Sequence, residues 1–196
     1  MLTRRDAVIA GALLPFIARE AAAVDITDPE NTLIMDLAGG TVTIALKPDV
    51  APRHVERIKM LTREGTYDNV AFHRVIPGFM AQTGDVQHGN MESGFDARRV
   101  GTGGSRHANL PAEFSDTPFR RGTLGMARSQ SPDSANSQFF ICFEDADWLN
   151  GQYTVFGEVI DGMEHVDAIK AGSRANNGMI DGTPDRIVSL RVAADG

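Results

Sequence analysis

The first clear pattern along the chain is an alternation of hydrophobic and polar residues between positions 33 and 46. A period of two places every second side chain on one face of a strand, and Gly39-Gly40 at the centre favours a tight turn. The segment therefore predicts a hairpin of two half-buried strands. The hydrophobic positions are Leu33, Met35, Leu37, Val42, Ile44 and Leu46.

A different spacing follows in two later segments, where hydrophobic residues recur every three positions. One segment lies between Pro52 and Gly65, and the other ends at Gly172. Proline favours the start of a helix and glycine its end, so the pattern predicts two helices. They are carried by Val55, Ile58 and Leu61 and by Met163, Val166 and Ile169.

Six further segments are short, rich in hydrophobic residues and separated by turns that contain glycine, which is typical of strands. With the hairpin they make eight strands. Eight short strands and two helices predict a mainly β fold: a closed eight-stranded antiparallel β-barrel capped by two α-helices, in one domain. The six segments are 71–76, 79–83, 123–127, 138–143, 154–160 and 186–192.

The beginning of the chain has a separate character. Residues 1–23 contain Arg4-Arg5, then an uncharged apolar run over 7–18 and finally three alanines, which is the order of a secretory signal. The apolar run is too short to span a bilayer, so we expect no stable membrane insertion. A helix docked on the domain is the alternative. We predict a cleavable export signal over 1–23 and a folded domain over 24–196.

The export route stays open. Thr3-Arg4-Arg5 resembles the start of a twin-arginine signal, but Ala7 stands where a large apolar residue is usual, so an ordinary secretion signal is an equal alternative. Both routes lead out of the cytoplasm. We therefore expect a periplasmic protein.

Composition narrows the classes of partner. The net charge of the 196 residues is −7, so the chain lacks the positive surface that holds a phosphate backbone, and we expect no nucleic acid partner. The single cysteine, Cys142, can form neither an internal disulfide nor a multi-cysteine metal site. A hydrophobic core must therefore stabilise the fold, and this length is sufficient for one.

Familiar catalytic motifs are missing from the sequence. The five histidines show no HxxxH or HExxH spacing, and there is no GxSxG or GxxxxGK[ST]. The segment 101–104, GTGG, can be interpreted as a phosphate loop, but it has no lysine and no following helix pattern, which favours a structural turn. We expect no metal and no cofactor.

Two apolar segments carry isolated polar groups. Strand alternation places Phe72 and Arg74 on one face of the first segment, and Gln138 and Phe140 on one face of the second. A charge beside aromatic rings costs free energy unless it is paired or used. The simpler interpretation is an arginine that extends to water, and core packing for each aromatic ring. Trp148-Leu149 adds further apolar surface.

Together these segments resemble the cyclophilins, the barrel-type peptidyl-prolyl cis-trans isomerases. The resemblance covers nearly all of residues 32–192. Its motifs are FHRVIPGFMAQTGD (72–85), GTGG (101–104), GMAR (125–128), NSQFFI (136–141), WLNGQYTVFGEV (148–159) and IVSLRV (187–192). It implies an eight-stranded barrel with two helices and a proline-binding groove on its outer surface.

The resemblance also implies residue roles. Arg74 is similar to the catalytic arginine of the family, with Gln82 and Phe79 beside it. Arg128 and Tyr153 depart from the asparagine and histidine usual in eukaryotic members and resemble bacterial ones. The implied pocket and groove residues are Phe79, Met80, Phe140 and Leu149, with Gln138 holding the substrate backbone and with Ala127, Arg128, Trp148 and Tyr153 along the groove.

The activity implied is rotation about X-Pro peptide bonds, which assists protein folding outside the cytoplasm. Its partners would be proline-containing peptides and unfolded or folding client proteins, and a cyclosporin-type macrocycle would bind against Trp148. We expect a monomer. Two alternatives remain: a proline-peptide-binding module or holdase chaperone without catalysis, and a structural barrel without a groove. A buried donor aimed at proline, as Arg74 would be, favours the isomerase over a pure binder.

Overall fold

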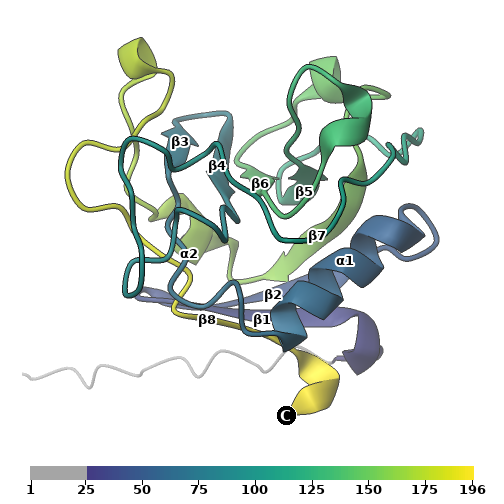
Figure 1. Ribbon diagram of the computed structural model, residues 1–196. Coiled ribbons are helices and arrows are strands. Elements are labelled where there is room, and N and C mark those ends of the chain that lie inside the picture. Colours follow the sequence, from purple (N-terminus) through teal and green to yellow (C-terminus); the bar gives the residue numbers. More distant parts are fainter. Residues whose placement is uncertain (1–25) are drawn as a thin grey trace, which may run out of the picture.

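The structure is a computed structural model, and it describes residues 26–196. Eight strands pair in one antiparallel sheet that curls around a hydrophobic interior (Figure 1). Their order is β3-β4-β6-β5-β7-β2-β1-β8. The strands are β1 (Thr32–Leu37), β2 (Gly40–Leu46), β3 (Arg74–Ile76), β4 (Met80–Thr83), β5 (Thr123–Met126), β6 (Phe139–Cys142), β7 (Val155–Asp161) and β8 (Ser189–Val192).

The predicted hairpin, the six further strands and the two helices are all confirmed, with shifts at their ends. Helix α1 (Pro52–Arg63) begins at the proline, as expected, and contacts β7 and β8. Helix α2 (Met163–Asp167) contacts β2 and ends five residues before Gly172. Short 3-10 helices complete the fold: η1 (Pro29–Asn31), η2 (Pro132–Ser134), η3 (Asp147–Leu149), η4 (Arg174–Asn176) and η5 (Ala193–Asp195).

Closure of the barrel is not confirmed. β3 and β8 are the two ends of the strand order and do not pair with each other as strands. The segments just before them meet in one isolated antiparallel bridge, Ala71 with Arg186. Two backbone hydrogen bonds flank this bridge, from Phe72 N to Asp185 O at 2.8 Å and from Ile187 N to Val70 O at 2.9 Å. The described sheet is therefore an open, curled one.

The two faces of the sheet differ because strand side chains alternate. In β4 and β6, Ala81 and Ile141 point into the interior cluster, whereas their neighbours Met80 and Cys142 belong to a second cluster on the outer face. The interior cluster joins both β-sheet ends and both helices. Its largest buried members are Tyr67, Phe72, Phe139, Phe156, Leu33, Met35, Ile44, Ile58, Leu61 and Leu124.

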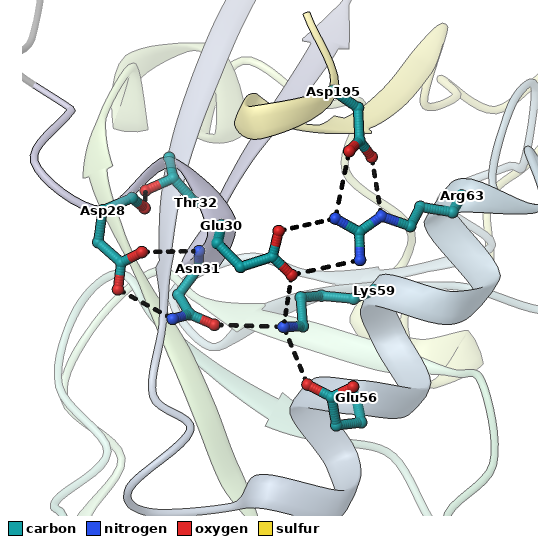
Figure 2. A network of polar contacts seen from close by, with 8 residues as sticks. All are labelled: Asp28, Glu30, Asn31, Thr32, Glu56, Lys59, Arg63 and Asp195. Atoms are coloured by element: carbon teal, nitrogen blue, oxygen red, sulfur yellow. Dashed lines mark hydrogen bonds and ion pairs between the residues drawn. The ribbon is translucent and has the colours of Figure 1, made fainter.

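An ion-pair network ties both ends of the described chain to α1 (Figure 2). Arg63 binds Glu30 of η1 and Asp195 of η5, and Lys59 binds Glu30 and Glu56. The hydrogen bonds from Arg63 and Lys59 lower the pKa of Glu30 to about 2. The network therefore holds η1 and η5 against α1.

The predicted export signal over 1–23 lies outside the described residues. Within residues 26–196, no helix is long and apolar enough to cross a membrane.

Candidate active site

A second hydrophobic cluster lies on the outer face of β4, β5, β6 and β7. We call it the outer cluster. Two features of the strands place it there: the register pairs Met80 with Cys142 and Gln82 with Phe140, and every second residue points outward. Its members are Met80, Phe119, Phe140, Cys142, Ala146, Leu149 and Val155, with Ile76, Phe79, Ala127 and Tyr153 packed against them.

A glycine in β5 makes room for the rings of this cluster. Phe119 and Phe140 stack with ring centroids 5.8 Å apart, directly over Gly125. A Cβ at position 125 would lie 2.4 Å from Phe140 Cζ and 2.6 Å from Phe119 Cε1. Only glycine lets the two rings approach the backbone this closely.

Arg74 lies at the edge of the outer cluster and is half-buried. Its Nη1 donates to Gln82 Oε1 at 3.0 Å, across the β3–β4 pair that aligns the two residues. Its Nε and Nη2 donate to the backbone oxygen and to Oδ1 of Asn177, both at 3.0 Å. Burial lowers the pKa of Arg74, but a guanidinium stays charged at neutral pH. The result is a fixed positive group beside apolar rings.

A line of amide side chains supports Arg74. Gln82 Nε2 donates to Gln138 Oε1 at 3.0 Å, and Gln138 Nε2 donates to the backbone oxygen of Gly103 at 2.8 Å. Each amide thus donates on one side and accepts on the other, which determines its orientation. Gln82 presents its oxygen to Arg74 because its nitrogen is already committed.

The glycine-rich segment 101–104 is held by Asp85. The fully buried Asp85 carboxylate accepts the backbone N–H groups of Gly101 and Gly103 at 2.7 and 2.9 Å. It also accepts those of Gln87 and His88 at 3.1 and 2.9 Å. A carboxylate of the chain itself therefore occupies the place that a phosphate would take in a phosphate loop. This favours the structural interpretation of the segment.

Beside Arg74, the outer cluster forms a pocket of about 150 Å³. We call it the first pocket. A second pocket of about 250 Å³ shares Gln82, Ala127 and Arg128 with it. The first is lined by Arg74, Phe79, Gln82, Ala127, Arg128, Phe140, Leu149 and Tyr153, and the second by Gln82, Gly101, Thr102, Gly103, Ala127, Arg128, Ser129, Ser134, Asn136 and Gln138.

Aromatic residues form the rim of the first pocket. Trp148 is 60% exposed and its ring centroid lies 5.5 Å from that of Phe79. Tyr153 meets Phe140 edge to face at 5.9 Å, and the Arg128 guanidinium carbon lies 4.4 Å from the Tyr153 ring centroid. Arg128 also donates to the backbone oxygen of Gln152 at 3.1 Å, so it is held in place from two sides.

The structure brings most of the residues singled out in the sequence to this region, in different positions. Met80 is buried, with its sulfur 3.9 Å from Arg74 Nη1, and so lies behind the first pocket. Gln138 lines the second pocket, and Trp148 contacts Phe79 at the rim. The others line the first pocket.

One expectation about this region is wrong. Phe72 belongs to the interior cluster, whereas Arg74 lies at the outer one, so the two do not share a face. The cause is that β3 begins only at Arg74, and the chain before it does not keep the alternation of a strand.

Sequence reasoning missed Asn177, Asp85 and Phe119. Asn177 lies 103 residues after Arg74, and only its neighbour Gly178 marks a turn in the sequence. Asp85 stood at the end of a quoted motif without a role. Phe119 is fully buried in the outer cluster but lies in an irregular segment without periodicity.

Comparison with known proteins matches this geometry to a family. The model of the family described as "Cyclophilin type peptidyl-prolyl cis-trans isomerase/CLD" matches residues 32–192. The chain belongs to the cyclophilin family. It is therefore a peptidyl-prolyl cis-trans isomerase, as the sequence motifs predicted.

The chain is similar to curated bacterial peptidyl-prolyl cis-trans isomerases over most of its length. It is 58% identical over 191 residues to a probable peptidyl-prolyl cis-trans isomerase of Brucella suis, covering 97% of each chain. It is 39% identical over 159 residues to peptidyl-prolyl cis-trans isomerase B of Escherichia coli, covering 77% of this chain and 91% of that one.

Solved cyclophilin structures share the fold. A cyclophilin from Hirschia baltica superposes with a TM-score of 0.71 at 25% identity, covering 86% of this chain and 76% of the other. A cyclophilin-type isomerase of Cryptosporidium parvum, crystallised in the presence of the dipeptide Ala-Pro, gives a TM-score of 0.68 at 26% identity, covering 82% and 98%.

Proposed function

We propose that this cyclophilin accelerates rotation about X-Pro bonds in client proteins outside the cytoplasm, with Arg74 as the catalytic donor and the first pocket as the site for proline. The observation that carries the proposal is the position of Arg74: a charged donor, fixed by Gln82 and Asn177, beside an apolar pocket. Gln82 holds Arg74, while Phe79, Phe140 and Leu149 enclose the proline ring.

The mechanism follows from amide resonance. Rotation is slow because the partial double bond must be broken, at a barrier of about 18–20 kcal/mol. The lone pair of the proline nitrogen is free only in the twisted state, so a donor aimed at this nitrogen stabilises that state more than either planar isomer. No nucleophile and no metal take part.

Arg74 keeps an N–H group that can act as this donor. Its three hydrogen bonds to Gln82 and Asn177 use one N–H on each guanidinium nitrogen. A guanidinium has five N–H groups, and the second one on Nη1 faces the Met80 sulfur at 3.9 Å, so among the described residues Nη2 keeps one N–H without a partner. A rate increase of five powers of ten corresponds to a barrier lowered by about 7 kcal/mol. A donor in a water-poor site supplies about 3 kcal/mol of this, and fit and desolvation about 1–5 kcal/mol.

A holdase or a proline-peptide-binding module is the alternative function. Trp148, the single tryptophan, is a natural reporter for the distinction because it lies at the rim beside Phe79. We expect a short Ala-Pro peptide both to change the tryptophan fluorescence and to be isomerised by the wild type. Binding without turnover would support the alternative. The absence of both binding and turnover would support a structural barrel without a groove.

Export is proposed from the sequence of residues 1–23 alone. The test is to express the full chain in a Gram-negative bacterium, isolate the periplasmic fraction and determine the N-terminal residue of the protein. We expect Val24. A chain that stays in the cytoplasm and begins at Met1 would refute both the signal and the periplasmic location.

We also propose that the sheet closes into a barrel in solution, through the segments 70–72 and 185–187. The bridge between Ala71 and Arg186 and its two flanking hydrogen bonds support this. Slow hydrogen exchange of the Phe72 and Ile187 amides, equal to that of strand amides, is the expected result. Fast exchange of these two amides would show that the sheet stays open in solution.

A further inference from the structure

The loop that contains Asn177 is attached to the edge strand β3. Val75 N donates to Gly178 O at 2.7 Å, and Gly172 N donates to Val75 O at 2.9 Å. Arg74 and Met179 form an isolated antiparallel bridge. Backbone contacts therefore hold this loop next to Arg74.

Within the loop, Asn177 has an unusual backbone conformation. Its φ is +52°, in the left-handed region that asparagine tolerates better than most residues. It follows η4, and its N–H donates to Arg174 O at 3.2 Å. In this conformation the backbone oxygen and the side-chain Oδ1 of one residue both reach Arg74.

The two contacts complement the one from Gln82. Gln82 binds only Nη1, and a single hydrogen bond at one end of a planar fork permits rotation of the group. Asn177 binds Nε and Nη2, on another edge of the same plane. Contacts on two edges fix both the position and the tilt of the guanidinium, and catalysis depends steeply on such orientation.

We infer that Asn177 is a positioning residue of the isomerase: it orients Arg74 toward the proline nitrogen. The inference rests on the proposed catalytic role of Arg74. Asn177 lies outside the residues that line either pocket, so it acts through Arg74.

Asn177→Gly is the sharpest variant. Glycine adopts a positive φ without strain and keeps the backbone oxygen, so only the Oδ1 contact is lost. We expect kcat to fall about fivefold to tenfold with KM little changed, while the thermal midpoint stays the same or rises. A purely structural role of Asn177 would instead lower the midpoint together with the activity.

Two further variants complete the test. Asn176→Gly, at the exposed neighbouring asparagine, is the matched control and should keep wild-type kinetics. Asn177→Asp keeps an oxygen acceptor for Nη2 and should lose much less activity than Asn177→Gly. Wild-type kcat in Asn177→Gly, or an equal loss in Asn176→Gly, would overturn the inference.

Failure of this inference and failure of the proposed function give different results. If Arg74→Ala is inactive while Asn177→Gly is fully active, only the positioning role is wrong. If Arg74→Ala has wild-type activity, Arg74 is not the catalytic donor and the inference about Asn177 is overturned with it.

The two pockets differ in charge from the rest of the chain. The chain is acidic overall, yet none of the described residues that line the two pockets is Asp or Glu, and two of them are Arg74 and Arg128. Within residues 26–196, neither arginine forms an ion pair. Arg128 lines both pockets and is held over Tyr153.

We propose that Arg128 selects substrates with an acidic residue near the proline. This also rests on the first pocket being the proline site. Pre-ordered by Tyr153 and backbone oxygens, Arg128 offers an acid its charge with little further loss of side-chain entropy.

The test uses a neutral peptide and four peptides with glutamate at one of the two positions before or after proline. We expect kcat/KM to rise about threefold for at least one of the four at low salt, and the gain to vanish in 1 M NaCl and in Arg128→Gln. Arg120→Gln, at an arginine that pairs with Asp145 and Asp147 and lines neither pocket, is the control and should keep the gain. Equal rates for all five peptides would overturn the proposal.

Discussion

The interior cluster and the outer cluster are built by the same strands, yet one forms the core and the other borders a pocket. Phe139 and Phe140 are neighbours in β6: Phe139 packs edge to face with Tyr67 and Phe156 in the interior, and Phe140 meets Phe119 and Tyr153 outside. The interior cluster is apolar and buried. The outer cluster is smaller, open on one side and bordered by Arg74.

The difference shows that alternation in a curled sheet provides two separate sets of side chains. The interior set supplies most of the stability, because it buries many more apolar side chains than the outer set. The other set is free to form a site. Its polar line of Arg74, Gln82 and Gln138 lies along the outer face, where the interior packing does not have to accommodate it.

The largest effect that separates the two clusters is expected in the interior. Phe156 is fully buried there, and Phe156→Ala should lower the free energy of unfolding by about 3–5 kcal/mol, because it removes apolar contacts and leaves a cavity. Urea unfolding measures this. The activity of the molecules that remain folded should be unchanged, and a specific loss of activity would show that the two clusters are not independent.

A smaller effect is expected from Gly125→Ala in the outer cluster. The added methyl group would displace Phe140 and Phe119, which alters the floor of the first pocket. We expect kcat/KM to fall about tenfold, equal to about 1.4 kcal/mol, with a smaller loss of stability than Phe156→Ala causes. If kcat/KM is unchanged, the position of Phe140 does not matter for catalysis.

The sequence predicted the two faces of the sheet better than it predicted the contacts made by residues outside the strands. Alternation correctly placed Gln138 and Phe140 on one side of the sheet: Gln82, which pairs with Phe140 in the β4–β6 register, also donates to the Gln138 side chain. It failed at Phe72, where the strand has not begun. Asn177 could not be predicted, because its contact with Arg74 depends on a left-handed residue in a distant loop rather than on a periodic pattern. The absence of β3–β8 pairing could not be predicted either, because it depends on how far the sheet curls.

A pH effect is expected at the N-terminus of α1. Burial lowers the pKa of His54 despite the nearby Glu113, whose carboxylate lies 2.6 Å from its ring. Burial would raise the pKa of Glu113, but hydrogen bonds from the His54 ring and from the Arg53 and His54 N–H groups outweigh it and lower that pKa.

Both groups bind fewer protons in the folded than in the unfolded state, so stability falls with decreasing pH. The loss should begin near pH 6.5, the ordinary pKa of histidine, and continue below 4.5, that of Glu113. His54→Gln should reduce the upper part of the profile in urea unfolding at several pH values, but not remove it, because burial also lowers the pKa of His73. A profile that is flat between pH 7 and 5 in the wild type would contradict this.

The smallest expected effect concerns a cyclosporin-type macrocycle at the rim of the outer cluster. Trp148 offers it an exposed ring and an N–H donor, whereas Arg128, held over Tyr153, adds a charge to the rim. We expect measurable inhibition that weakens severalfold in Trp148→Phe and tightens in the double variant Tyr153→His with Arg128→Asn. Inhibition constants measure this, and equal constants in all three proteins would refute it.

We propose that the outer cluster with Arg74 is a catalytic site rather than only a binding surface. The most direct test of this proposal is Arg74→Ala, with turnover of an Ala-Pro peptide, peptide binding by Trp148 fluorescence and thermal unfolding measured on the same samples. We predict that kcat falls at least a hundredfold, about 2.7 kcal/mol, while binding weakens far less and the unfolding midpoint stays near that of the wild type. Wild-type kcat in a folded Arg74→Ala protein would contradict the account.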